Sequence, residues 1–407
     1  MKDKAKSYSL LLMAVLALVT AGAVSVPRFL AFGPGIAGVL FFAFYSWAFG
    51  QRPRFSKPVF IIVAATAGLA LASCLWAIDP GDALGRALRM ALVIASGAFL
   101  VNLFLMIEVS RLRPYLWFFP AAVMAIAVLV FIELECGAPL HRLVRGMAAG
   151  AFVPPAKFNR AMVTMALSFF PAMAILRHYV SKKIMAGLMA VFVFPALLVT
   201  ESQSAQLALF FGTVFLVAFP YRRRAAWYGL FGIIVILMLV APFASTWVFQ
   251  RFAMDVQSVP LLGQGGAYAG NRLEIWDYVS RYALQKPFLG FGIEAAREIT
   301  DFDSHEIFQE GKSILHPHNF VLQLWLEFGV IGALCGAGLI GYLLNLMRTK
   351  LSTAQCRIAL PTLIAVLSVA STGYGMWQGW WLGLLFLSAS FCILAIRLEA
   401  ELAKTVA

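Results

Sequence analysis

The sequence predicts an all-α protein that crosses a membrane about 12 times, in helices of roughly 20 residues. Of its 407 residues, 62% are hydrophobic and 13% are charged, and the mean hydropathy is +0.85. Soluble globular chains are much less apolar and carry more charge. The apolar runs and the placement of basic residues between them indicate the same class, so the composition excludes a water-soluble fold.

The apolar runs approach the roughly 17 to 25 residues that a helix needs to cross about 30 Å of hydrocarbon. The eleventh run is the shortest. In chain order we expect the spans at residues 9–26, 29–49, 58–77, 84–106, 114–132, 161–176, 184–200, 203–219, 226–244, 318–346, 358–371 and 376–396.

Basic residues gather in every second loop. Examples are Lys4 and Lys6, Arg52 and Arg54, and residues 222–224, and few acids accompany them. Cytoplasmic loops collect Lys and Arg, so the pattern predicts that both termini face the cytoplasm. The net charge of +13 is then explained by the orientation of the chain in the membrane, and we expect no nucleic-acid partner.

One long polar segment, residues 245–317, falls on the outward side. Connections of this length, roughly 70 residues, are usually functional or disordered. Apolar residues at helical spacing after Asn271, followed by Pro287, predict short helices inside it. We therefore expect transmembrane helices 1 to 9 in residues 1–244, a large outer loop in 245–317, and helices 10 to 12 in 318–407.

A dense polar cluster stands where this loop meets the tenth span. It reads His316-Pro317-His318-Asn319, with Glu327 further along the helix. Ionisable groups at membrane depth are costly, so their presence suggests function. Two structural alternatives remain: Asn319 as a cap for free amides at the helix start, and Glu327, which is off the face of His318, as a polar contact to a neighbouring helix.

The same segment resembles the signature of the O-antigen ligase and polymerase superfamily. The resemblance rests on His-Pro-His-Asn with Leu-Gln-Leu-Trp-Leu-Glu-Phe-Gly at 322–329, and on Asn-Arg-Leu-Glu-Ile-Trp at 271–276 and Lys-Pro-Phe-Leu-Gly-Phe-Gly at 286–292. It covers the C-terminal half closely and the N-terminal half in outline. The resemblance implies a multi-pass glycosyltransferase of the bacterial inner membrane that moves a glycan from undecaprenyl pyrophosphate to an acceptor hydroxyl on the periplasmic face.

By this resemblance His318 is the first choice for the essential histidine and His316 the second. Arg272 matches the family's outer-loop arginine, which is taken to contact the pyrophosphate; His316, Asn319 and Glu327 would orient the site. The chemistry asks for such residues. A histidine with a pKa of about 6.5 suits proton removal from the acceptor hydroxyl, and guanidinium groups stabilise a departing pyrophosphate.

Other outward residues are candidates for substrate binding. Arg86 and Arg89 share a helical face at the outer end of the fourth span, and Lys157 and Arg160 precede the sixth. Contact with lipid headgroups is the competing role for these cations. Gln203 stands where the family commonly has an arginine, so either another cation compensates or the alignment is shifted by a few residues.

We expect neither a metal ion nor a cofactor. Asp301-Phe302-Asp303 fits the Asp-x-Asp pattern of metal-dependent glycosyltransferases and lies on the outward side. Such a tripeptide often arises by chance, and this one stands in an exposed acidic stretch.

The function we expect is a metal-independent, inverting O-antigen ligase whose acceptor is a hydroxyl of lipid A-core. One alternative is an O-antigen or exopolysaccharide polymerase, with the same donor and a glycan acceptor. A transporter or flippase is the alternative of another class. It would predict matching halves and charges deep in the helices, whereas the ionisable residues here gather in outer loops and at helix ends.

Overall fold

The computed structural model describes residues 2–148, 150–258, 268–308 and 313–406, and every regular element in these ranges is a helix. Two parts of the predicted outer loop, residues 259–267 and 309–312, lie outside the described residues.

The elements of the first half are α1 (Lys2–Ala21), η1 (Pro27–Ala31), α2 (Gly33–Ala43), α3 (Tyr45–Phe49), α4 (Lys57–Ser73), α5 (Pro80–Met106), α6 (Val109–Leu112), η2 (Arg113–Tyr115), α7 (Phe118–Glu135), α8 (Pro139–Arg145), η3 (Pro155–Phe158) and α9 (Asn159–Leu176). Those of the second half are α10 (Lys182–Leu188), η4 (Met189–Val193), α11 (Phe194–Val199), α12 (Gln203–Ala218), α13 (Arg224–Ser258), α15 (Tyr268–Ala283), η5 (Ala295–Arg297), α16 (Phe320–Lys350), α17 (Thr353–Thr372) and α18 (Gly379–Val406).

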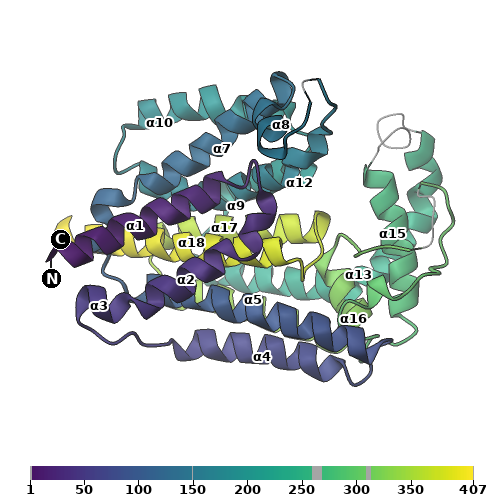
Figure 1. The fold of residues 1–407 in the computed structure, drawn as a ribbon. Coiled ribbons are helices and arrows are strands. Elements are labelled where there is room, and N and C mark those ends of the chain that lie inside the picture. The colour runs from purple at the N-terminus through teal and green to yellow at the C-terminus, as the bar shows by residue number, and fades with distance from the viewer. Residues whose placement is uncertain (1, 149, 259–267, 309–312, 407) are drawn as a thin grey trace.

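The predicted class, an all-α polytopic membrane protein, is confirmed. Among the described residues, nine helices are long and apolar enough to cross a membrane, and α2, α4 and α12 are shorter apolar helices. Both termini lie at the same end of the bundle and α15 lies at the other (Figure 1), as an even number of crossings requires. The count of about 12 spans and the cytoplasmic side of the termini stay predictions.

Several helices differ in extent from the predicted spans; α18, for example, continues to Val406 instead of ending at residue 396. The run at 29–49 is divided into α2 and α3, which meet at Phe44. α17 begins before the predicted residue 358, because the Ser352 hydroxyl accepts from the Gln355 amide and the Gln355 side chain accepts from the Ser352 amide. α13 continues past residue 244 to Ser258, so its last turns belong to the segment we expected to be loop.

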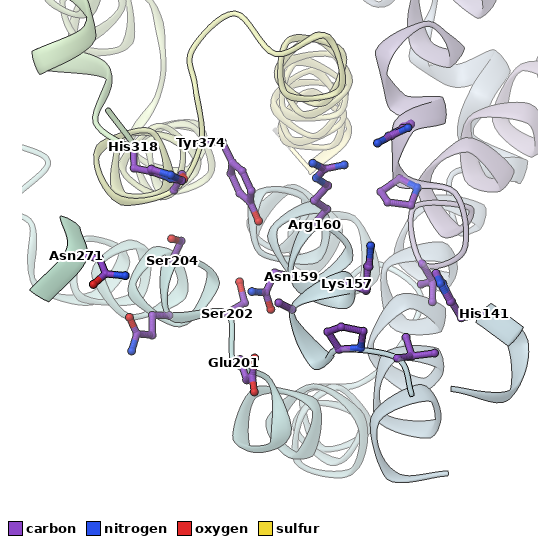
Figure 2. A pocket seen from close by; sticks show the side chains of 18 of the residues that line it. His141, Lys157, Asn159, Arg160, Glu201, Ser202, Ser204, Asn271, His318 and Tyr374 are labelled. Carbon is purple, nitrogen blue, oxygen red and sulfur yellow. The ribbon is translucent and has the colours of Figure 1, made fainter. Parts of the chain in front are cut away.

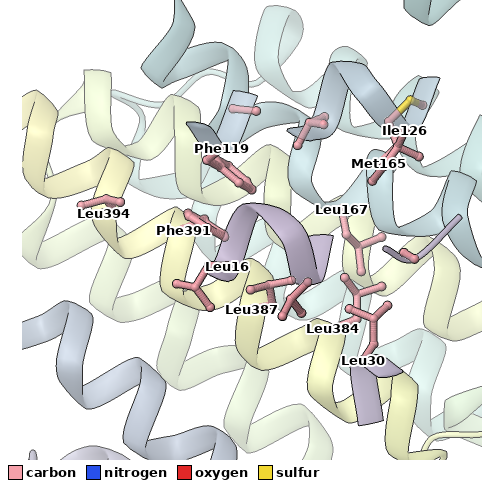
Figure 3. Packing of buried hydrophobic residues seen from close by; sticks show 14 of the residues in the cluster. Leu16, Leu30, Phe119, Ile126, Met165, Leu167, Leu384, Leu387, Phe391 and Leu394 are labelled. Carbon is pink, nitrogen blue, oxygen red and sulfur yellow. The ribbon is translucent and has the colours of Figure 1, made fainter. Parts of the chain in front are cut away.

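The core of the bundle forms around α18, which contacts α5, α9 and α17. The rings of Phe119 on α7 and Phe391 on α18 stack with centroids 3.5 Å apart, and Leu16 and Leu387 pack beside them (Figure 3). All four side chains are fully buried. This packing holds α18 in place and, with it, the connection from α17, residues 373–378, which lines the site described next.

Candidate functional site

The His-Pro-His-Asn segment is held between α15 and α16. The Trp276 indole on α15 donates to the Pro317 carbonyl at 3.0 Å. The Asn319 side chain accepts from the amides of Val321 and Leu322, so the helix-capping role is the one the geometry shows. His318, between these two anchors, has a φ of 57°, a left-handed conformation that a residue with a side chain rarely adopts.

A backbone carbonyl fixes the proton of His318. Its Nδ1 lies 2.5 Å from the carbonyl oxygen of Gly373 in the connection before α18. A carbonyl oxygen only accepts, so Nδ1 carries the hydrogen, and in the neutral ring Nε2 keeps the lone pair. Burial lowers the pKa of His318, the bond to Gly373 raises it, and the Arg272 guanidinium lowers it again. The balance is a lowered pKa, which favours the neutral ring.

His316 lies behind His318. The two ring centroids are 4.2 Å apart, but His316 is only 9% exposed and does not line the cavity that His318 faces. The Gln378 amide donates to its Nδ1 at 3.4 Å, and the Trp380 indole donates to Gln378 at 2.7 Å. Burial, helped by His318, lowers the pKa of His316 to about 3, so its ring is neutral at physiological pH.

A cavity of about 950 Å³ lies in front of His318. Figure 2 shows His318 and Asn271 on one side of it, Lys157 and His141 on the other, and Tyr374 with Arg160 between them. Its permanently cationic lining residues are Arg28, Arg145, Lys157, Arg160 and Arg272. Among the described residues that line it, Glu201 is the one acid. The cavity is therefore strongly positive and suits an anionic ligand.

A second cavity of about 710 Å³ adjoins the first, and Arg28 and Arg160 line both. Part of its wall is apolar and faces outward from the bundle: Leu92 on α5 is 71% exposed and Phe32 is 51% exposed. Exposed apolar side chains on a membrane helix face lipid. Arg89 lines this cavity, with its Nε bonded to the Gly85 carbonyl at 3.1 Å.

Arg86 also lines the second cavity, but its guanidinium is engaged by carboxylates. Its Nη2 lies 3.0 Å from Asp82 and 2.6 Å from Glu298, and its Nε lies 3.7 Å from Glu294. Three acids compensate one cation, so Arg86 ties α5 to the loop around η5. Arg89 is the better candidate for anion binding of the predicted pair.

Glu327 lies outside both cavities and is fully buried. Its carboxylate accepts from Gln323 at 2.7 Å and from the Trp377 indole at 2.5 Å, and the Gln323 side chain accepts from the Met376 amide at 2.9 Å. The pair on α16 thus clamps the same connection that presents the Gly373 carbonyl. This is the contact to a neighbouring segment that the sequence left open for Glu327.

The 286–292 motif acts through backbone packing. At Gly329 the helix α16 is interrupted, with φ 61° and ψ −154°. The Val330 amide donates to the Pro287 carbonyl at 2.7 Å, and the amides of Phe291 and Gly292 donate to carbonyls of α16. A Cβ at Gly329 would run into the backbone of Phe288, so glycine permits this close approach.

The remaining candidates fall in different places. Gln203, at the start of α12, is exposed and lines the first cavity. The Tyr374 phenol also lines it, and burial raises the pKa of this phenol to about 12.

Asp303 pairs with Arg281 on α15, so one carboxylate of the Asp-x-Asp pattern has a structural partner. Among the described residues no three His, Cys, Asp or Glu side chains are grouped as metal ligands, and metal independence stays a prediction.

Most of the predicted residues come together in the two cavities. His318, Arg272, Arg160, Lys157 and Gln203 line the first, and Arg86, Arg89 and again Arg160 line the second, whereas His316, Asn319 and Glu327 support the site from behind.

The prediction missed Arg28, which lines both cavities, as well as Arg145 and Arg297, which each line one of them. Arg28 carried a usable signal, because it is a cation on the predicted outward side of a chain whose basic residues are expected to gather inside.

Comparison with known proteins agrees with the resemblance drawn from the motifs. Residues 188–337 match the family model described as O-antigen ligase, and this range contains all three motifs. "Putative polysaccharide ligase RC0486" of Rickettsia conorii is 31% identical over 118 residues, and "Putative polysaccharide ligase RT0347" of Rickettsia typhi is 32% identical over 119. Each match covers 28% of this chain, and the chain spans 29% of the length of these relatives.

Proposed function

We propose that the chain, whose residues 188–337 match the O-antigen ligase family model, is a glycosyltransferase of that family. It would move a polysaccharide from undecaprenyl pyrophosphate to a hydroxyl of lipid A-core at the periplasmic face of the inner membrane. The observation that carries the proposal is the pairing of His318 Nδ1 with the Gly373 carbonyl. It leaves Nε2 as a base in a cavity whose charged lining residues, among those described, are five cations and one acid, Glu201.

The donor would bind where the two cavities meet. Its diphosphate would lie among Arg28, Arg89 and Arg160 and reach toward Arg272, because guanidinium groups form paired, charge-assisted hydrogen bonds to phosphate oxygens. The polyprenyl chain would leave through the apolar wall of the second cavity, past Leu92, into the bilayer. The glycan would extend into the first cavity.

The reaction would be a single displacement at the anomeric carbon. The acceptor oxygen attacks that carbon while Nε2 of His318 takes the hydroxyl proton, and the bond from the carbon to the diphosphate oxygen breaks with its electron pair on the diphosphate. The leaving lipid diphosphate gains one negative charge, which the cations of the cavity stabilise. Attack opposite to the leaving group inverts the anomeric configuration.

His316 and Glu327 would act by positioning. The buried neutral ring of His316 supports the ring of His318 from behind. Glu327, through Gln323 and Trp377, holds the connection that carries Gly373.

The test is transfer by the purified protein from purified lipid-linked glycan to purified lipid A-core, with and without a chelator. We expect a lipid-A-linked product of inverted anomeric configuration, at the same rate in chelator. A product lengthened on the lipid carrier would instead assign repeat-unit polymerisation, and loss of activity in chelator would contradict metal independence. A product with the donor's configuration would rule out single displacement.

A further inference from the structure

A third cavity lies at the opposite end of the bundle from His318, on the side where both termini lie. It has a volume of about 660 Å³ and is bounded by α9, α10, α12 and the start of α17. Its apolar wall consists of Phe169, Phe170, Met173, Met185, Met189, Leu216 and Ile358. Methionine and phenylalanine side chains make an adaptable surface, which suits a flexible hydrocarbon chain.

The rim of this cavity is basic. Arg177, Lys182 and Arg357 line it, and none of its lining residues is acidic among those the structure describes. A smaller cavity of about 330 Å³ shares Arg357 with it and adds Arg222 and Arg223. The two cavities adjoin at Thr353 and Arg357, and together, as the groove, they are apolar along one part and positive along the other.

The cations of the rim differ in whether a carboxylate of the protein already pairs with them. Arg177 pairs with Glu399 on α18. Arg357 lies over the Tyr221 ring at 5.7 Å, and for Arg357 and Lys182 no carboxylate partner is found among the described residues. Both are exposed. Two cations at the mouth of an apolar groove are thus available to an external anion.

The groove opens toward lipid. The helix that runs through α10, η4 and α11 (Lys182–Val199) is only 11% buried over its apolar window, and α10 lies at the edge of the bundle in Figure 1. Its middle, Met189–Val193, is a π-helical turn, a widened geometry that often marks functional positions, and Met189 faces the cavity. A ligand could enter sideways from the inner leaflet.

We propose that this groove binds an anionic glycerophospholipid of the inner leaflet. The phosphate would lie between Lys182 and Arg357, and an acyl chain would follow Phe169, Met173 and Met189. Basic pockets between membrane helices on the cytoplasmic side recognise anionic headgroups in this way. The inference rests on the proposed cytoplasmic orientation of this end and not on the transfer reaction, so its failure would leave the transferase proposal standing.

The test is native mass spectrometry of the detergent-purified full chain titrated with phosphatidylglycerol or with zwitterionic phosphatidylethanolamine. We expect saturable binding of phosphatidylglycerol that Lys182→Gln/Arg357→Gln weakens about 30-fold, since each of the two cations near a headgroup contributes on the order of 1 kcal/mol. The matched control, Arg52→Gln/Arg54→Gln, removes two exposed cations of another inward loop and should leave affinity within about twofold.

Filling the groove gives an independent readout. Met189→Trp should weaken phosphatidylglycerol binding without changing any charge, provided that the melting temperature stays that of the wild type. Equal binding of both lipids, or equal loss in the two charge variants, would overturn the proposal. If Met189→Trp unfolds the protein, the comparison of Lys182→Gln/Arg357→Gln with Arg52→Gln/Arg54→Gln decides the question.

Discussion

The imidazole of His318 and the carbonyl of Gly373 are hydrogen-bonded across two segments 55 residues apart in the chain. His318 precedes α16 and Gly373 follows α17, so the bond forms only when the start of α16 and the end of α17 are correctly packed. It fixes which nitrogen carries the proton, and thereby links the packing of the bundle to the protonation state of the proposed base.

The acid limb of the pH profile, where the rate falls as the pH drops, should lie below pH 6.5. The folded-state pKa of His318 is lowered, chiefly by burial, so the base is neutral at pH 6.5 and becomes protonated, and inactive, only as the pH drops through the lowered value. The profile of kcat/KM against pH, which reports the free enzyme, measures this. An acid limb above pH 6.5 would contradict the assignment.

Replacing Arg272 should move that limb. Arg272→Gln removes a positive charge beside His318, so the pKa of the ring rises and the acid limb shifts to higher pH. It should also lower kcat/KM about 10- to 100-fold through lost charge-assisted bonds, and Arg272→Lys should fall between, because it keeps charge but loses the planar fork. The control is Arg251→Gln, which removes an exposed arginine near the end of α13. An acid limb that stays in place in Arg272→Gln would show that the charge of Arg272 does not act on the pKa of His318.

Glu327 should behave as a positioning residue. Glu327→Ala leaves the buried Gln323 donor and the partly buried Trp377 donor without their acceptor, at a cost of up to about 1 to 3 kcal/mol each. We expect a lower melting temperature and a lower kcat, with the acid limb of the pH profile unchanged. Glu327→Gln keeps one acceptor oxygen and should be milder in both; a shifted limb at full stability would indicate direct proton transfer by Glu327.

Two glycines of α16 make a matched pair for stability. Gly329→Ala places a Cβ against the backbone of Phe288 at a φ of 61°, and should destabilise the fold by more than about 2 kcal/mol. Gly338→Ala meets nothing within 4 Å and should be neutral or stabilise by up to about 1 kcal/mol. Thermal unfolding of both variants in the same detergent tests this, and equal melting temperatures would refute the packing argument.

Much of the fold could be predicted because hydropathy acts locally. Each apolar run appears as helical structure, and the errors concern where helices begin and end: the Ser352 cap lengthens α17, and the run at 29–49 is divided at Phe44. Most of the cationic and imidazole side chains that line the two cavities could likewise be named from the sequence. The contacts that bring them together could not be predicted, since Gly373 contributes a backbone carbonyl that has no sequence signature, and two of the three carboxylates around Arg86, those of Glu294 and Glu298, come from a distant segment.

The removal of His318 tests the catalytic proposal most directly. In the transfer assay, His318→Ala should lose about 100- to 10,000-fold in rate, the usual contribution of a positioned base. Added imidazole should restore part of the loss, while His178→Ala, which removes a histidine near Glu399 at the other end of the bundle, should match the wild type. Wild-type turnover by His318→Ala without imidazole would contradict the assignment of His318 as the base.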